Sequence, residues 1–228
     1  MTTQLYNRLA MGGKFQKCQV DKFLALLDRN FYKSLEIGCG KGFFSYVAAK
    51  TGKVTEVVGC DVFNDFQVEE LGHYANTVEY KNIANNTVPY GDNTFDLVFS
   101  MDVLEHVEND ALFVKEHPRA CKKGGRVILG TPNYFRATNL VVYLLGQLKY
   151  PRDMGSDTYG RCVHLREYGK NQLLELVKSS GSFIDENSIK IIPCWLGVMA
   201  LDVGISKLPH FLENYCQFWL IKNYDAKS

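Results

Sequence analysis

The sequence predicts an α/β fold in which a largely parallel sheet is covered by helices on both faces. Short apolar segments alternate with helical segments along most of the chain, which is the pattern of a parallel sheet. A turn with glycines at alternate positions follows the first apolar segment, and Asp61 closes the second. Open α/β sheets bind ligands at the carboxyl ends of their strands, so we expect these two features at one site.

The first strand is expected at 34–38, where apolar residues run into the glycine turn, and the helix Phe43–Thr51 follows it. Gly124 and Gly125 predict the turn into the fifth strand, and Pro132 is expected to end that strand. Gly197–Lys207 has a helix-like pattern near the end of the chain. The remaining expected strands are 56–61, 78–82, 95–100, 125–130, Ser188–Pro193 and Gln217–Asn223.

The composition is that of an ordinary globular protein. The chain has 228 residues, of which 46% are hydrophobic and 22% are charged, and its formal net charge is +1. This length fits one domain with room for an additional lobe. Basic and acidic residues are interspersed, and no basic cluster indicates binding to a phosphate backbone. Nucleic acid is therefore not expected as a partner.

The cysteine pattern predicts free thiols in a reducing cytosol. None of the seven cysteines forms a Cys-x-x-Cys pair, and the chain begins without an apolar leader. A cytoplasmic location is therefore expected. The most apolar stretches, Asn139–Leu148 and Trp195–Leu208, are too short or too interrupted by charges to span a bilayer. The cysteines stand at positions 18, 39, 60, 121, 162, 194 and 216.

The glycine turn argues against two common phosphate-binding motifs. A dinucleotide fingerprint would have a third glycine where this chain has Phe43, and a P-loop would have Ser or Thr after Lys41, where Gly42 stands. The segment Glu36-Ile37-Gly38-Cys39-Gly40-Lys41-Gly42 instead resembles motif I of the class I S-adenosylmethionine (SAM) dependent methyltransferases. A dehydrogenase is accordingly a less favoured alternative.

Further segments extend the resemblance over about residues 34–185, in the order and at the spacing of that family. The group most similar is the set of small-molecule methyltransferases typified by the quinone-biosynthesis O-methyltransferases. The matching segments are Val88-Pro89-Tyr90-Gly91-Asp92-Asn93-Thr94-Phe95-Asp96-Leu97-Val98, Asp102-Val103-Leu104-Glu105-His106-Val107, Lys122-Lys123-Gly124-Gly125, Thr131-Pro132-Asn133 and His164-Leu165-Arg166-Glu167-Tyr168.

The resemblance implies a fold, a domain organisation and a cofactor. The fold is a seven-stranded Rossmann-like methyltransferase sheet of order 3-2-1-4-5-7-6, with strand 7 antiparallel. The whole chain, 1–228, is one such domain, with an N-terminal cap over 1–28 and a lid insertion over 134–162. The cofactor is SAM, and its expected contacts are Glu36, Gly38, Cys39, Gly40, Gly42, Asp61, Val62, Asn82, Ile83, Ala84, Met101 and Asp102.

Two of these contacts have alternatives. Asp61 is expected to accept hydrogen bonds from the ribose, although an isolated aspartate after an apolar strand also serves as a simple turn or helix cap. The family usually has an acid after its third strand, where this chain has Asn82. We therefore expect Asn82, or the backbone of Ile83 and Ala84, to face the adenine.

The expected chemistry needs a positioned nucleophile and, for a hydroxyl acceptor, a general base. His106 follows the fourth strand closely and is the candidate base; a helix-start residue or an adenine-side contact is the alternative. Asp102 and Glu105 could orient His106 or could favour the positive end of the following helix. His164 and Tyr134 are expected on the acceptor side, although a hydrogen bond that fixes the return of the lid is an equal alternative for His164.

Other polar residues are given no catalytic role. His73, His117 and His210 are expected at the surface or at a boundary. No metal is implied, because Asp96, Asp102 and Asp110 fit no clear ligand set for a catechol-type magnesium site.

The predicted function is methyl transfer from SAM to a hydroxyl of a small metabolite, aromatic or lipid-like in character. Aromatic and basic residues in the lid favour such an acceptor, although a helix that packs its Val141-Val142-Leu144-Leu145 face on the domain is an equal alternative for this segment. Contact of Leu140–Leu148 with a membrane surface is a weaker alternative. A small-molecule, sugar or peptide acceptor methylated at nitrogen or at a carboxyl group fits equally well. A catalytically inactive SAM-binding scaffold subunit is the alternative from another class, but it would have no chemical need for motif I and Asp61.

Overall fold

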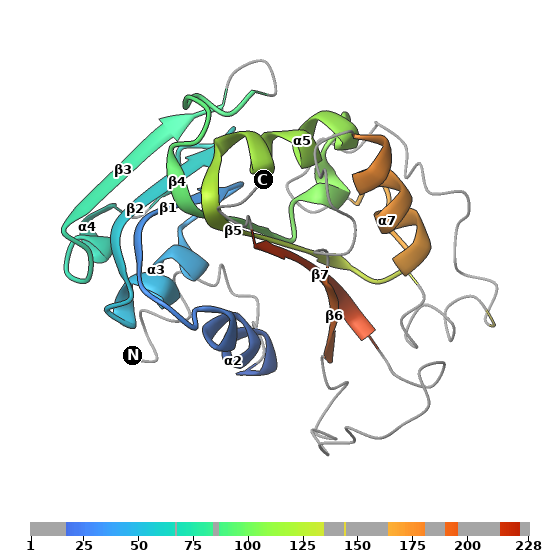
Figure 1. Cartoon of the computed structure of the whole chain (residues 1–228), viewed down its shortest axis with the longest axis horizontal. Helices are drawn as coiled ribbons and strands as arrows, with labels where there is room; N and C mark the ends of the chain where they lie inside the picture. The colour runs from blue at the N-terminus through green and yellow to red at the C-terminus, as the bar shows by residue number, and fades with distance from the viewer. Residues whose placement is uncertain are drawn as a thin grey trace.

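The computed structural model describes residues 17–66, 68–83, 87–134, 144, 164–180, 190–195 and 215–223 (Figure 1). The helices are α2 (Lys17–Leu26), α3 (Phe43–Lys50), α4 (Val68–Leu71), the 3₁₀-helix η1 (Leu104–His106), α5 (Asp110–Ala120) and α7 (Lys170–Ser179). The strands are β1 (Phe31–Ile37), β2 (Val54–Asp61), β3 (Thr77–Asn82), β4 (Phe95–Met101), β5 (Cys121–Pro132), β6 (Lys190–Trp195) and β7 (Tyr215–Asn223).

These strands form one sheet of order β3-β2-β1-β4-β5-β7-β6. Strands β1 to β5 pair in parallel, which confirms the predicted α/β class. Strand β7 runs antiparallel to both of its neighbours, β5 and β6. The order agrees with the one that the resemblance implies. The order in which successive strands are added to the sheet changes direction between β1 and β4. At such a point the carboxyl ends of the neighbouring strands leave room for a ligand.

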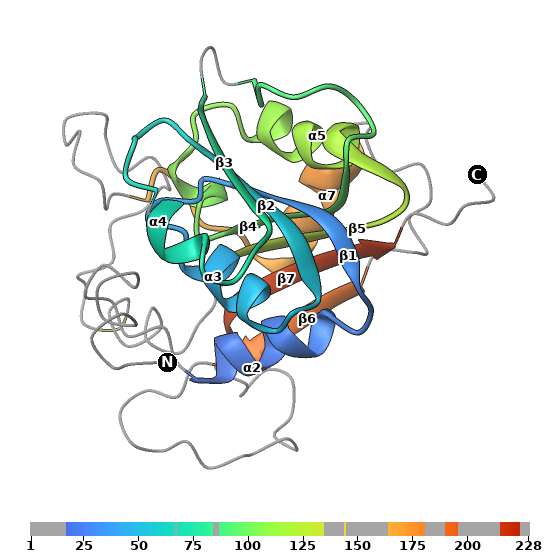
Figure 2. The ribbon, with the colours of Figure 1, turned by 90° about the vertical axis from the view of Figure 1, so that its left-hand side faces the viewer.

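Helices cover both faces of the sheet (Figures 1 and 2). Helices α2, α3 and α4 lie on one face, and α5 and α7 lie on the other. Neighbouring residues of the central strand β4 contribute to two cores: Leu97 and Phe99 belong to the cluster beneath α2 and α3, whereas Val98 belongs to the cluster beneath α5 and α7. This alternation follows from the two-residue period of a strand and holds the sheet between two apolar layers.

Strand β5 begins earlier than the glycines predict. Gly124 has a φ of 78° and lies inside the strand, where the register with β4 shifts between Phe95↔Cys121 and Leu97↔Arg126. The extra residues form a bulge rather than a turn before the strand, because pairing resumes on both sides of them. The first two strands also begin earlier than expected, at Phe31 and Val54, which pair with each other.

Helix α2, in the N-terminal part of the chain, contributes to the core. Phe23 of α2 is fully buried and packs its ring against Phe44 and Phe99, with centroids 5.1 Å apart in both pairs. After the helix, Asp28 forms a bidentate ion pair with Arg126 of β5, at 2.8 and 3.0 Å. Helix α2 is therefore attached to the sheet by both apolar and ionic contacts.

Several expectations fall on residues outside the described ranges. Among them are Ala84, His210, the helix-like Gly197–Lys207 and most of the lid insertion 134–162. Within the residues that are described, no helix combines the length and the apolar character needed to cross a membrane.

The expectation that His117 lies at the surface or at a boundary is wrong. Its side chain is fully buried; Nδ1 lies 2.9 Å from the carbonyl oxygen of Phe113 and Nε2 lies 2.9 Å from the hydroxyl of Ser100. Val114 and Ala120, three residues to either side, are also buried, so the helical spacing places His117 on the inner face of α5. Burial lowers the pKa of His117 to about 4.

We expect this histidine to make the protein sensitive to acid. Because its pKa is lower in the folded state than the ordinary value of 6.5, the unfolded chain binds a proton that the folded chain does not as the pH falls. The stabilisation is fully present above pH 6.5 and is lost towards pH 4, by about 3 kcal/mol. Urea unfolding of the wild type and of His117→Gln between pH 7.5 and pH 4.5 measures this. In His117→Gln the free energy of unfolding should lose most of its dependence on pH, whereas His73→Gln, at an exposed position, should keep it. An equal pH dependence in all three proteins would contradict the role given to His117.

Candidate cofactor and acceptor site

The glycine turn at the end of β1 is a tight loop held against β2. The N–H groups of Gly38 and Cys39 both donate to the carbonyl of Cys60, at 2.7 and 3.2 Å, and the N–H of Gly42 donates to the carbonyl of Cys39 at 2.7 Å. Gly38 and Gly42 have φ values of 72° and 83°. A side chain at Gly38 would collide with Val103, and one at Gly42 would collide with Phe66. Both positions therefore require glycine for conformation and for space.

Glu36 supports this loop from below. Its side chain is only 4% exposed, and its Oε2 atom accepts hydrogen bonds from the N–H of Ser45 at 2.9 Å and from the Ser45 hydroxyl at 2.5 Å. Burial raises the pKa of Glu36 to about 8. The carboxyl group is engaged through Oε2 with the first turn of α3, and its contact with a cofactor stays a prediction. Cys39 is likewise buried within the loop.

Asp61 closes the loop from the neighbouring strand. Its Oδ2 atom accepts the N–H of Gly40 at 2.7 Å, and its Oδ1 atom accepts the N–H of Phe63 at 3.1 Å. The side chain is 8% exposed. Because each carboxylate oxygen can accept more than one hydrogen bond, Asp61 can also receive a hydroxyl from a ligand lying on the loop.

The segment after Asp61 is fixed by residues of β3. The hydroxyl of Tyr80 donates to the carbonyl of Phe63 at 2.6 Å, and the Asn82 side chain donates to the carbonyl of Val62 at 3.0 Å. Val62 itself is 55% exposed. Asn82 therefore holds the backbone of Val62 and leaves the apolar Val62 side chain at the surface, where a flat ring could lie on it. Ile83, also half-buried, follows directly.

The end of β4 is the third part of the candidate site, after the glycine turn and the segment that follows Asp61. Met101 is the last residue of the strand and is largely buried. Asp102 has a φ of 57°, a left-handed conformation that is uncommon for a residue other than glycine, and its N–H donates to the carbonyl of Gly130 at 3.0 Å. Residues in such strained backbone conformations, which cost about 1–3 kcal/mol each, cluster at functional sites. The turn at Asp102 directs the chain into η1 and places Val103 against Gly38.

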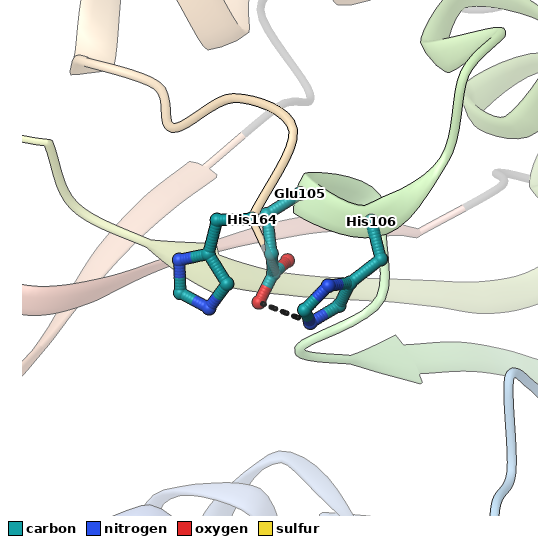
Figure 3. A group of neighbouring side chains, drawn as sticks. All are labelled: Glu105, His106 and His164. Atoms are coloured by element: carbon teal, nitrogen blue, oxygen red, sulfur yellow. Dashed lines mark ion pairs between the residues drawn. The ribbon is translucent and has the colours of Figure 1, made fainter. Parts of the chain in front are cut away.

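Two histidines and a glutamate meet beside this turn. Figure 3 shows the carboxyl group of Glu105 between the rings of His106 and His164. The Nε2 atom of His106 lies 3.9 Å from Oε1 of Glu105, and the two rings meet edge to face with centroids 4.9 Å apart. Both imidazoles are about 30% exposed, whereas the Glu105 side chain is 0% exposed. The two histidines are thus brought together although 58 positions separate them.

Glu105 is the centre of this group. Its Oε2 atom accepts the hydroxyl of Thr131 at 3.1 Å, and its backbone carbonyl accepts the N–H of Leu165 at 2.7 Å. Burial and the neighbouring charge of Asp102 hold the pKa of Glu105 well above its usual range. Glu105 therefore joins η1, β5 and the segment 164–168 in one place.

The segment 164–168 is itself well anchored. His164 places Nδ1 2.7 Å from Oε1 of Glu167, and Arg166 forms an ion pair with Asp110 at 2.7 Å. The N–H of Tyr134 donates to the carbonyl of Tyr168 at 3.0 Å. Tyr134 and His164, the two residues expected on the acceptor side, consequently lie where the insertion 134–162 leaves the sheet and returns to it.

Comparisons with known proteins agree with this geometry. A family model described as a methyltransferase domain matches residues 35–129. The ubiquinone biosynthesis O-methyltransferase of Mesorhizobium japonicum is 32% identical over 182 residues, which are 75% of this chain and 69% of that protein. The chain belongs to the class I SAM-dependent methyltransferases. It spans about half to two thirds of the length of the first four curated relatives that it matches, 52 to 63%.

Solved structures described as methyltransferases share the fold. A Thermotoga maritima protein described as a SAM-dependent methyltransferase superposes with a TM-score of 0.64 at 16% identity, covering 98% of this chain and 96% of that one. A chain from the complex of a Haloferax volcanii methyltransferase with its activator Trm112 also gives 0.64, at 12% identity, covering 99% and 96%. At these identities the likeness concerns the fold alone.

The residues present fit SAM, the cofactor of this family. The loop 38–42 has the tight, glycine-dependent conformation of a ligand-binding turn, with Val103 packed against Gly38 and Phe66 against Gly42. Asp61 offers a carboxylate for a ribose, and Val62 offers an exposed apolar surface for an adenine ring.

Sequence reasoning missed the supporting residues Ser45, Tyr80 and Glu167. The acid three residues from His164 was a signal for Glu167, whereas nothing local to Ser45 or Tyr80 points to their partners.

Proposed function

We propose that the protein transfers the methyl group of SAM to a hydroxyl of a small metabolite of aromatic or lipid-like character. The observation that carries the proposal is the meeting of two groups at one edge of the sheet: the loop 38–42 with Asp61, and His106 with His164. Val103 links the two groups, because it packs against Gly38 and directly precedes η1. A ligand on the loop would therefore extend towards the histidines.

Each described residue has a role in this proposal. The loop 38–42 and Asp61 hold the amino-acid tail and the ribose, and Val62 with Asn82 and Ile83 borders the adenine. When bound, SAM would supply an electrophilic methyl group to the acceptor oxygen. His106 takes the hydroxyl proton, and its Nε2 atom lies 3.9 Å from Oε1 of Glu105, which limits the orientation of the ring. Positioning of this kind contributes on the order of 7–11 kcal/mol, and a general base about 10²–10⁴-fold.

We also propose that residues 1–28 cap the site and that 134–162 form a lid that selects the acceptor. Support for the lid comes from Tyr134, its first residue, which donates its N–H to Tyr168, and from His164, just beyond its last residue, which lies close to Glu105. Support for the cap comes from α2, whose Phe23 packs on α3 directly after the glycine loop. A cytoplasmic location is proposed from the cysteines, three of which, Cys39, Cys60 and Cys121, are buried free thiols.

Calorimetric titration with S-adenosylhomocysteine tests the cofactor site. We expect micromolar binding to the wild type and a loss of about 10–100-fold in Asp61→Asn, because hydrogen bonds to a charged group contribute about 1.5–3 kcal/mol. Glu69→Gln, on the exposed surface of α4, is the matched control and should bind as the wild type does. Equal affinity of Asp61→Asn and the control would remove Asp61 from the site.

The acceptor is then identified with labelled SAM and panels of phenols, carboxylic acids and amines. Methylation of the phenols supports the hydroxyl acceptor, and transfer to acids or amines alone would replace it with the corresponding class. Tight binding of S-adenosylhomocysteine with no transfer to any member of the panels would favour a scaffold subunit.

A further inference from the structure

Asp110 is a partly buried aspartate in the first turn of α5, with a side chain that is 23% exposed. Its Oδ1 atom accepts the N–H of Ala111 at 2.8 Å. A carboxylate is also favoured at the positive end of a helix. These local contacts account for Oδ1 and leave Oδ2 available to a distant part of the chain.

The Oδ2 atom of Asp110 receives two side chains of the segment 164–168. The Nη1 atom of Arg166 lies 2.7 Å from it, and the hydroxyl of Tyr168 donates to it at 2.9 Å. The Nη2 atom of Arg166 donates further to the backbone carbonyl of Glu108, at 2.8 Å. Hydrogen bonds between charged groups are the strong ones in proteins. The start of α5 therefore holds this segment by two side chains at one carboxylate.

The same segment begins with His164, the histidine that faces His106. The two rings meet edge to face with centroids 4.9 Å apart, on either side of the Glu105 carboxyl group (Figure 3). The N–H of Leu165 donates to the backbone carbonyl of Glu105 at 2.7 Å. The backbone next to His164 is thus held on one side by η1 and, through Arg166, on the other side by α5.

Two acidic side chains divide the placement of His164 between them. Glu167 lies 2.7 Å from Nδ1 of the His164 ring and so orients the imidazole itself. Asp110 binds the side chains that follow His164 in the segment and so fixes the backbone that carries the ring. An oriented ring is useful only if its backbone is also held in place, so Asp110 completes what Glu167 begins.

We propose that Asp110 is a positioning residue for methyl transfer that acts through His164. By holding the two donors of the segment 164–168, it keeps the His164 ring beside the His106 ring at the acceptor side. The effect on methyl transfer rests on the proposed function, whereas the placement of the two rings does not. Positioning of this kind has a large effect on a rate, because a misplacement of about 1 Å can lower it about 100-fold.

Asp110→Asn is the variant that isolates this role. The asparagine keeps an oxygen for the N–H of Ala111 and so preserves the start of α5, but it places an NH₂ group, which cannot accept a hydrogen bond, at the position of Oδ2. Asp92→Asn is the matched control, because Asp92 also binds an arginine, Arg119, at 2.8 Å, but in an exposed loop.

Nuclear Overhauser effects between the histidine rings test the placement directly. The protein is labelled with ¹³C in its five histidines, and the signals are assigned from the spectra of His106→Asn and His164→Asn. We expect a cross-peak between the His106 and His164 rings in the wild type and in Asp92→Asn, and a much weaker one in Asp110→Asn. A cross-peak of wild-type intensity in Asp110→Asn, or none in the wild type, would overturn the proposal.

Kinetics with labelled SAM and the best acceptor test the consequence for the reaction. We expect Asp110→Asn to lower kcat by roughly tenfold or more and to raise the KM of the acceptor, with the affinity for S-adenosylhomocysteine unchanged. In the background of His164→Ala, Asp110→Asn should have little further effect on kcat, because the residue through which it acts is absent. An equal loss in both backgrounds would show a merely structural role and overturn the proposal.

A second variant keeps the test decisive if Asp110→Asn does not fold, as thermal unfolding would show. Tyr168→Phe removes one of the two donors and retains Asp110, and it should change the cross-peak and kcat in the same direction by less. Loss of the cross-peak in Asp110→Asn, together with a wild type that transfers no methyl group, would support the placement by Asp110 and remove the proposed function.

Discussion

Replacing Gly38 by alanine is expected to weaken binding of S-adenosylhomocysteine at least 100-fold and to destabilise the protein by about 3 kcal/mol. A new Cβ at this position would lie 2.6 Å from Cγ1 of Val103 and closer still to Cγ2, in a backbone conformation with φ of 72°. The left-handed conformation costs about 1–2 kcal/mol, and forcing a methyl group into a packed site costs about 1–3 kcal/mol. The loop can relieve the collision only by moving away from Val103, which displaces the proposed cofactor contacts. Calorimetry and urea unfolding measure the two effects.

Gly52 supplies a matched control for the backbone contribution. Its φ is 70°, close to that of Gly38, but a Cβ there would have nothing within 4 Å. Gly52→Ala should therefore cost only the conformational part, about 1–2 kcal/mol, and should leave the affinity unchanged. The double variant Gly38→Ala/Val103→Ala should recover part of the lost stability. If Gly38→Ala and Gly52→Ala behaved alike, the contact with Val103 would not be what requires glycine at position 38.

Replacing His106 by alanine is expected to lower the turnover of methyl transfer by roughly 100-fold or more, with S-adenosylhomocysteine binding retained. A general base contributes about 10²–10⁴-fold. The ring is about 30% exposed and packs against His164, so its removal leaves the glycine loop and Asp61 unaltered. The measurement is a single-turnover assay with labelled SAM and the best acceptor from the panels.

His73→Ala is the control for this experiment, because His73 lies on the exposed surface and contacts Tyr74. It should transfer methyl groups at the wild-type rate. Unchanged turnover in His106→Ala would remove this histidine from the chemistry, whereas loss of S-adenosylhomocysteine binding would indicate an adenine-side contact instead.

Features that depend on local sequence were predictable. The parallel sheet, the glycine loop and the place of Asp61 follow from apolar periodicity and from residue types at short spacing. The start of β5 was not, because Gly124 fits a turn and a bulge equally well, and only the pairing with β4 distinguishes them. Sequence reasoning likewise assigned His117 by its polarity, although its spacing from Val114 and Ala120 places it on the buried face.

The centre of the candidate site depends on contacts between distant residues. His106 and His164 were each predicted near the acceptor, but their meeting requires the N–H of Leu165 to reach the carbonyl of Glu105. No local pattern contains that contact, and none shows that Glu105 is fully buried. Glu36 illustrates the same limit: the motif indicates an acid at this place, but only the path of α3 brings Ser45 to it.

The antiparallel β7 has a consequence for the order in which the molecule can form. Residues 215–223 lie between β5 and β6, so β6 has no neighbour in the sheet until the last strand arrives. The strands that carry the glycine loop, Asp61 and Glu105 are all synthesised earlier, and domains can begin to fold during synthesis. Pairing β5 with β7 joins segments about 90 residues apart, and such long-range pairing is slow because the intervening chain must first be closed into a loop. We therefore expect the cofactor half to become ordered first, with β7 as the strand that completes the sheet.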